Sequence, residues 1–248
     1  MTQVTQTRGA STLRAMREQK RRLAVLLLSG ALAFPATGLA GAVNPSAANP
    51  VKGTAEVSVQ SLAASVDHHY NSLRSLRVEF SQQYAGMGMN RHESGTLLLK
   101  KPGRMRWIYS QPAGKLFVLD GKYAYFYGPG DTQVQRVAAK QLDDLRSPLR
   151  FLLGHTQLEK ELIGLTATPS GTGYVLSGTP KGMEKRIERM SLEVTPDGVI
   201  HAMKIEEVDG ALTTFKLSGE QTNPPTSDAE FVFQAPKGVP VVEGLPPV

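Results

Sequence analysis

The 248-residue chain contains no cysteine. This absence excludes a disulfide framework, a thiol nucleophile and a thiolate metal site. It also removes the acylated cysteine by which some exported bacterial proteins are tethered to a membrane directly after their cleavage site. We therefore expect the exported form of this chain to be released rather than held by acyl chains of its own.

Patterns that support catalysis or metal binding are also lacking. His68 and His69 are adjacent on an expected helix, so they cannot form the i, i+4 pair of a helical metal site. Glu206 and Glu207 are adjacent on an expected strand and face opposite ways, so they cannot share a proton as an acid–base pair. No serine lies in a nucleophile-elbow sequence. We expect no enzymatic activity, no metal and no cofactor.

The one apolar run near the N-terminus is too short for a membrane span. Residues 23–34 are mostly apolar, but Pro35 ends the run short of the ~20 residues that a span needs. A basic segment precedes it, and Ala40-Gly41-Ala42 has the small-x-small pattern of a cleavage site. We predict that residues 1–42 are a cleaved signal peptide. The pair Arg21-Arg22 leaves both general and twin-arginine export open.

The positive charge of the chain is concentrated in this N-terminal segment. The formal net charge is +6, from 28 basic and 22 acidic residues. Residues 1–42 hold six of the basic residues and one of the acidic ones, so the remainder has 22 and 21, a net charge of +1. Nucleic-acid binding would require a clustered basic surface on the folded domain. We expect no nucleic-acid partner.

The rest of the chain reads as a leader and one domain. Residues 43–56 are rich in Ala, Pro, Asn and Gly and are predicted to be a flexible leader. Residues 57–76 carry apolar side chains at helical spacing, with Ser58 or Ser61 as the cap. We expect a single domain over residues 57–248.

Strands dominate from residue 77 onward. They alternate with a period of two and are joined by tight turns such as Pro102-Gly103 and Asp120-Gly121. A helical insert at 141–164 interrupts them, with Ser147-Pro148 as a helix start. Successive hairpins of this kind predict a strongly curved sheet or an open barrel. The expected strands are residues 77–84, 95–101, 104–109, 115–119, 123–127, 133–137, 174–177, 187–194, 199–206, 212–217 and 231–233.

The hairpin over residues 95–109 is the most informative element. Leu97, Leu99 and Lys101 share one face of its first strand. An apolar surface with a cation at its edge suits a lipid-like ligand better than bond-breaking chemistry. The alternative is that these alternating side chains form only the packed face of a sheet.

The same hairpin carries a family resemblance. The resemblance extends over about residues 57–243, and its most specific part is the stretch from Ser94 to Tyr127. On these residues the chain resembles the periplasmic outer-membrane lipoprotein carrier family, the LolA-like proteins. The matching runs are Ser94-Gly95-Thr96-Leu97, Lys100-Lys101-Pro102-Gly103-Arg104, Arg106-Trp107-x-Tyr109, Val118-x-Asp120-Gly121-Lys122, Tyr125-x-Tyr127, Ser147-Pro148-Leu149 with Leu152-Leu153-Gly154, Phe231-x-Phe233 and Pro236-x-Gly238-Val239.

The resemblance implies a fold and a function. The fold is a mainly β domain with α elements: an unclosed antiparallel β-barrel of about ten or eleven strands, capped by helices, with an apolar cavity between. The function is to take acylated lipoproteins from an inner-membrane ABC transporter and pass them, through the periplasm, to an outer-membrane receptor. We expect a monomer without a cofactor. A shuttle for a free lipid or glycolipid, an envelope sensor of lipoproteins and a periplasmic hydrolase are the alternatives.

The resemblance also assigns roles to residues. Family members carry Arg immediately before the matched Pro102, where it bonds to the backbone at a helix cap and holds the cavity shut. Here the position is Lys101, which keeps the charge but loses the planar fork of donors. We expect a weaker latch, with a solvated turn residue as the alternative. The expected cavity residues are Leu97, Leu99, Met105, Trp107, Tyr109, Val118 and Met203, and the expected lid residues are Leu149, Leu152 and Leu153.

Overall fold

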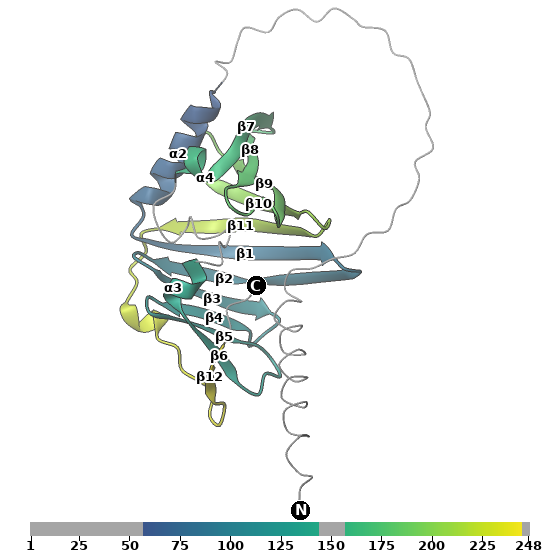
Figure 1. Cartoon of the computed structure of the whole chain (residues 1–248). Coiled ribbons are helices and arrows are strands. Elements are labelled where there is room, and N and C mark those ends of the chain that lie inside the picture. Colours follow the sequence, from purple (N-terminus) through teal and green to yellow (C-terminus); the bar gives the residue numbers. More distant parts are fainter. Residues whose placement is uncertain (1–56, 144–156, 245–248) are drawn as a thin grey trace, which may run out of the picture.

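The computed structural model describes residues 57–143 and 157–244. The predicted signal peptide, leader and lid residues lie outside this part. Within it, twelve strands form one sheet in the order β12-β6-β5-β4-β3-β2-β1-β11-β10-β9-β8-β7. Neighbouring strands are antiparallel, except that β12 runs parallel to β6. The sheet ends at β12 and β7, so the described strands form an unclosed sheet (Figure 1).

Most strands follow one another as hairpins, and four short helical elements accompany them. The helical elements are α2 (Val59–Ser72), α3 (Ala139–Asp143), α4 (Leu158–Glu161) and the 3-10 turn η2 (Asp228–Phe231). The strands are β1 (Ser75–Gly86), β2 (Met89–Lys100), β3 (Arg104–Gln111), β4 (Leu116–Asp120), β5 (Tyr123–Tyr127), β6 (Val134–Ala138), β7 (Leu162–Ser170), β8 (Gly173–Pro180), β9 (Ile187–Val194), β10 (Ile200–Glu207), β11 (Leu212–Thr222) and β12 (Val241–Glu243).

The mainly β, unclosed-sheet prediction is confirmed, with three corrections. β7 lies where the helical insert and a loop were expected; it is an edge strand with mostly exposed side chains, so it shows no alternation. The strand predicted at 231–233 is instead the 3-10 turn η2 and an extended segment. β12 was missed because three residues are too few to show a period.

α2 has the predicted cap and packs on one half of the sheet. The Ser58 hydroxyl accepts a hydrogen bond from the backbone N–H of Ser61 at 3.0 Å. The helix contacts β7, β8 and α4. Gly198, at the β9–β10 turn, lies against it: an added Cβ would fall 2.4 Å from the Ser65 carbonyl carbon, and its φ is +91°. Only glycine therefore allows this close approach. The buried side chains of the helix are Leu62, Ala63, Val66 and Tyr70.

One apolar cluster joins α2 to both halves of the sheet. We call the face of the sheet that carries this cluster the inner face, and the opposite one the outer face. Antiparallel register builds the inner face by aligning side chains across strands, for example Leu97 with Trp107 and Trp107 with Phe117. The core of the domain is therefore the inner face itself.

Candidate functional site

The structure brings most of the predicted cavity residues together on the inner face. Five of them are buried members of the apolar cluster, and Tyr109 packs against it half-buried. Met203 comes from the other half of the sheet, where it is paired with Phe215. The five cluster members are Leu97, Leu99, Met105, Trp107 and Met203.

Val118 is the exception, because the structure places it on the outer face. Its neighbours Phe117 and Leu119 contact the inner cluster, whereas Val118 is aligned with Arg106 in an outer row. The segment that follows β11 covers this row. η2 contacts β3 and β4, its Phe231 is only 1% exposed, and the Arg106 guanidinium donates to the Glu230 carbonyl at 2.8 Å. All four residues Leu116–Leu119 are apolar, so alternation could not assign the face.

Four aromatic rings form the centre of the inner face. The Phe80 ring lies edge-on to Trp107 and Tyr109, with centroids 4.7 and 5.2 Å apart, and Phe215 meets Trp107 at 6.1 Å. Gly95 lies between Phe80 and Tyr109 in the register and has no side chain to separate them. Phe80 and Phe215 were not among the predicted cavity residues, although both alternate with polar residues along their strands.

The polar group of Trp107 is satisfied within the centre of the face. Its indole N–H lies 2.8 Å from the Met105 thioether sulfur. Since Trp107 is buried, this contact leaves an apolar surface around it. A face of this kind offers burial to aliphatic chains and little to polar ligands.

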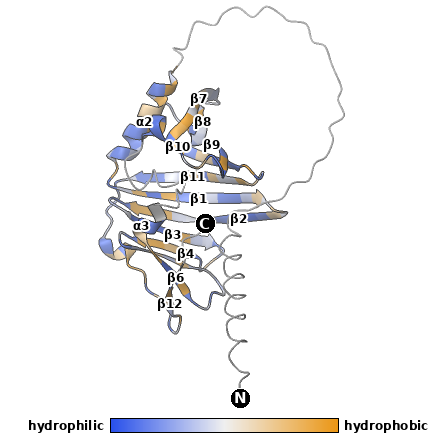
Figure 2. Ribbon diagram, in the orientation of Figure 1, coloured by the Kyte–Doolittle hydropathy of each residue, from blue (hydrophilic) through white to orange (hydrophobic). Residues whose placement is uncertain are grey.

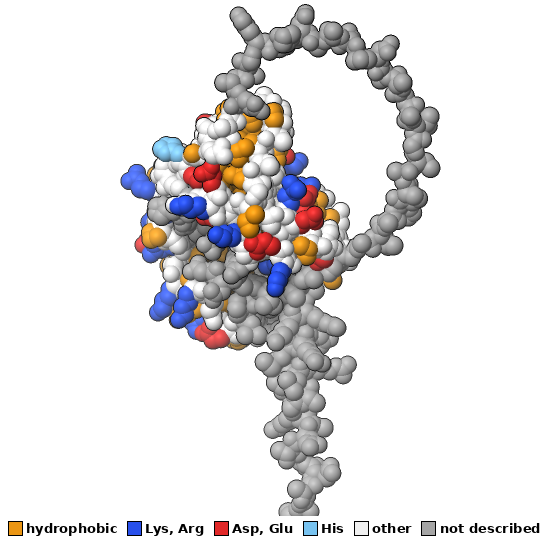
Figure 3. All heavy atoms as spheres, turned by 45° about the horizontal axis from the view of Figure 1, so that its top comes forward, with side chains coloured by type: hydrophobic (Ala, Val, Ile, Leu, Met, Phe, Trp, Pro, Cys, Tyr) orange, Lys and Arg blue, Asp and Glu red, His pale blue; other side chains and the backbone are white. Residues whose placement is uncertain are grey.

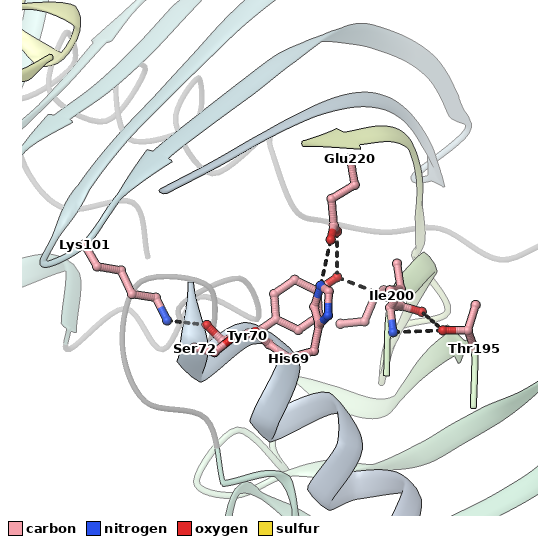
Figure 4. Close-up of polar contacts among 8 residues, drawn as sticks. His69, Tyr70, Ser72, Lys101, Thr195, Ile200 and Glu220 are labelled. Carbon is pink, nitrogen blue, oxygen red and sulfur yellow. Dashed lines mark hydrogen bonds and ion pairs between the residues drawn. The ribbon is translucent and has the colours of Figure 1, made fainter. Parts of the chain in front are cut away.

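Lys101 bonds to the end of α2. Its ammonium group donates to the Tyr70 carbonyl at 2.6 Å (Figure 4). Its backbone N–H donates to the Arg74 carbonyl at 2.8 Å. The carbonyls at a helix C-terminus carry partial negative charge and favour a cation. Burial lowers the pKa of Lys101. In the described part, the Lys101 side chain thus makes one hydrogen bond, to a helix carbonyl.

A polar cluster fixes the same end of α2 to β11. Glu220 accepts from the Tyr70 hydroxyl at 3.2 Å and lies 2.7 Å from His69 Nε2 (Figure 4). The Ile200 backbone N–H donates to the Tyr70 hydroxyl at 3.0 Å. Burial, and secondarily the Glu220 charge, raise the pKa of Tyr70. The last turn of α2 is thus held from two strands and one hairpin turn.

A second polar group lies at the opposite end of the inner face. The Lys115 ammonium lies 2.8 and 2.7 Å from the two Glu93 carboxylate oxygens and 4.4 Å from the centroid of the Tyr109 ring. Beside this pair is a shallow, solvent-open hollow lined by Gln82, Tyr84, Arg91 and Glu93. The inner face therefore changes from apolar to polar along its strands.

Other kinds of site find no support in the described residues. Across residues 57–143 and 157–244 no three His, Asp or Glu side chains lie close enough to hold a metal ion. No helix in the same ranges is long and apolar enough to cross a membrane. On the face drawn in Figure 3, basic and acidic side chains are interspersed rather than gathered by sign.

Comparison with known proteins gives consistent matches. The family model described as "Outer membrane lipoprotein carrier protein LolA" matches residues 71–234. An outer-membrane lipoprotein carrier protein of Nitrosospira multiformis is 31% identical over 175 residues, which cover 68% of this chain and 82% of that protein. One of Cupriavidus necator is 31% identical over 178 residues, covering 69% and 82%. The crystal structure of LolA superfamily protein NE2245 from Nitrosomonas europaea aligns with a TM-score of 0.41 at 13% identity, over 72% of this chain and 99% of that one.

Proposed function

The chain belongs to the LolA family of outer membrane lipoprotein carrier proteins, and from this membership we propose that it carries lipoproteins by binding their acyl chains on its inner face. The cargo comes from an inner-membrane lipoprotein-releasing ABC transporter and goes to an outer-membrane receptor. The carrier works in the periplasm, to which the predicted signal peptide directs it. This function requires no reaction at the site.

The inner face is the observation that carries the proposal. From the end of α2 to its aromatic centre it is a continuous apolar surface on an unclosed sheet, with four aromatic rings at that centre. The face contacts α2, a single helix whose last turn is held by a small number of polar bonds. An acyl chain can gain burial there if the side chains that fill the face rearrange.

The energetics of release also favour a filled rather than an empty face. Burial of one CH₂ of an acyl chain contributes about 0.8 kcal/mol, so a chain of about 16 carbons contributes roughly 12 and three chains roughly 36 kcal/mol. Noncovalent affinities seldom exceed about 18–21 kcal/mol, and a carrier at that limit would not release its cargo. Displacing the protein's own side chains offsets part of the gain. Four flexible methionines in the cluster suit such repacking: Met105, Met183, Met190 and Met203.

Native mass spectrometry tests the proposal. The full chain is exported in a Gram-negative host, purified from the periplasm and mixed with a triacylated lipopeptide below its micellar concentration. We expect a stoichiometric complex that an outer-membrane receptor fraction dissociates. Co-purification of a free lipid without any lipopeptide complex would contradict the carrier function and support a free-lipid shuttle.

A further inference from the structure

The inner face has a chemical direction. Near the end of α2 it is lined by apolar residues, among them Leu76, Leu99 and Met105. The aromatic centre follows, and the far end carries the Glu93–Lys115 pair and the hollow. Figure 2 shows the same change along β2, which is hydrophilic where it begins and hydrophobic toward its end. An ordinary apolar core would not require this gradient.

The Glu93–Lys115 pair is an unusual component of such a face. The two side chains are only 13% and 23% exposed, so both charges lose much of their hydration. Partly buried ion pairs are weak stabilisers, and apolar side chains of similar volume often stabilise a fold as well or better. Tyr109, which adds a hydroxyl beside the pair, has its pKa raised by burial and by the Glu93 charge, so the hydroxyl keeps its proton. The group therefore offers an ammonium donor, a carboxylate acceptor and a phenolic donor within one small region.

The opposite end of the inner face has its nearby cations already engaged. Lys101 donates to the α2 backbone, and Lys100 and Arg104 pair with Asp228, which belongs to the segment on the outer face. At the Glu93 end, by contrast, the paired charges Glu93 and Lys115 lie on the inner face itself, where the spare donors and acceptors of the pair can meet a ligand. The hollow there is shallow and open to solvent, so a small polar head can rest against it, but it cannot enclose a whole acylated ligand.

We propose that Glu93, Lys115 and Tyr109 bind the polar head of the acylated cargo, namely the ester and amide groups that join its acyl chains to the peptide. Lys115 donates to an ester or amide carbonyl, and Glu93 accepts from an amide N–H. The head then lies at the hollow, the acyl chains extend over the aromatic centre toward Leu99 and Met105, and the peptide leaves past the start of β2. This assignment rests on the proposed function and adds the direction in which the cargo lies.

Two probes separate this subsite from general lipid binding. The first is a triacylated lipopeptide, which has the ester and amide groups, and the second is N-phenyl-1-naphthylamine, a neutral apolar fluorophore that lacks them. Lys115→Met and Glu93→Gln remove the charges at similar size, and Lys216→Met removes an exposed lysine from β11 as the matched control. Because hydrogen bonds to charged groups are among the stronger ones, we expect Lys115→Met to weaken lipopeptide binding about ten-fold or more. We expect fluorophore binding to stay unchanged in all variants.

The outcomes distinguish the polar-head subsite from the carrier function. Equal lipopeptide affinity in the wild type and in both variants would overturn the subsite and leave the carrier function intact. Equal loss of both probes would also overturn it, since the ion pair would then serve only to join β2 and β4. Failure of the wild-type protein to bind the lipopeptide at all would overturn the proposed function and this inference with it.

Photo-crosslinking measures the direction in which the cargo lies on the inner face. A diazirine placed next to the ester group of the lipopeptide should label peptides around Glu93 and Lys115, and one at the end of an acyl chain should label those around Leu99 and Met105. The reverse pattern would overturn the proposal even if the affinities change as expected.

Discussion

The bond between Lys101 and the end of α2 makes a quantitative prediction. Replacing Lys101 with Met keeps the length of the side chain and removes the 2.6 Å bond to the Tyr70 carbonyl. A hydrogen bond from a charged donor contributes about 1.5–3 kcal/mol, and a cation at a helix C-terminus about 0.3–1 kcal/mol. Burial lowers the pKa of Lys101, so desolvation of the ammonium offsets part of this gain. We expect a net loss of about 1 kcal/mol, which lowers the melting temperature of a domain of this size by about 2–4 °C.

Lipid uptake by the same variant tests whether the bond restrains opening. The chain has one tryptophan, Trp107, at the centre of the inner face, so its fluorescence reports acyl-chain arrival directly. We expect faster uptake in Lys101→Met because the last turn of α2 loses one of its attachments. Lys101→Arg should not show the loss of stability seen in Lys101→Met, since the guanidinium group of arginine offers further donors to the same carbonyl. Melting and uptake identical to those of the Lys216→Met control would refute the reasoning.

Three further predictions concern single positions. Leu99→Glu places a charge in the apolar end of the inner face and should abolish lipopeptide binding in gel-shift or fluorescence assays. The control Lys216→Glu, on the outer face, should bind the lipopeptide normally. Normal binding by a folded Leu99→Glu variant would contradict the assignment of Leu99 to the inner face. Gly198→Ala should lower the free energy of unfolding by more than about 2 kcal/mol in urea titrations, because its Cβ would meet the Ser65 carbonyl of α2. Burial raises the pKa of Glu207, so the folded state binds the carboxyl proton more tightly than the unfolded state does. As the pH rises and the carboxyl ionises, its buried charge lowers the free energy of unfolding. Glu207→Gln should therefore stabilise the protein at pH 7, and this gain should vanish below the unfolded pKa of ~4.5; a gain that persists at pH 3 would have another cause.

Local sequence patterns predicted the helices and hairpins that depend mainly on residues close together in the chain. The helical period and the candidate caps Ser58 and Ser61 identified α2, which uses Ser58 as its cap. Pro102-Gly103 and Asp120-Gly121 identified hairpins that the structure contains. β7 was missed because an edge strand buries too little to impose a period. For Leu97 and Leu99, the sequence indicated the face of the sheet on which the side chains lie. In β4, where four consecutive residues are apolar, it did not, and Val118 was expected on the wrong face.

The contacts of the site depend on tertiary packing and could not be read from the chain. Lys101 bonds to Tyr70 only because the β2–β3 turn meets the end of α2. Glu93 meets Lys115 because β3 lies between β2 and β4 and the chain entering β4 brings Lys115 beside Tyr109. A residue pattern can indicate an apolar face and its edge cation, but the partner of a charge far along the chain depends on how the elements dock.

The position of β1 has a consequence for how this chain folds after export. Nine of the eleven ladders among the described strands join strands that are consecutive in sequence, so two meanders, β1–β6 and β7–β11, can form from local contacts. β1 meets β11 only once nearly the whole domain has been translocated, and this ladder is the long-range step that unites them. Until then β1 is an open edge able to pair with another chain. The stage most exposed to aggregation is therefore the interval between emergence of β1 and arrival of β11.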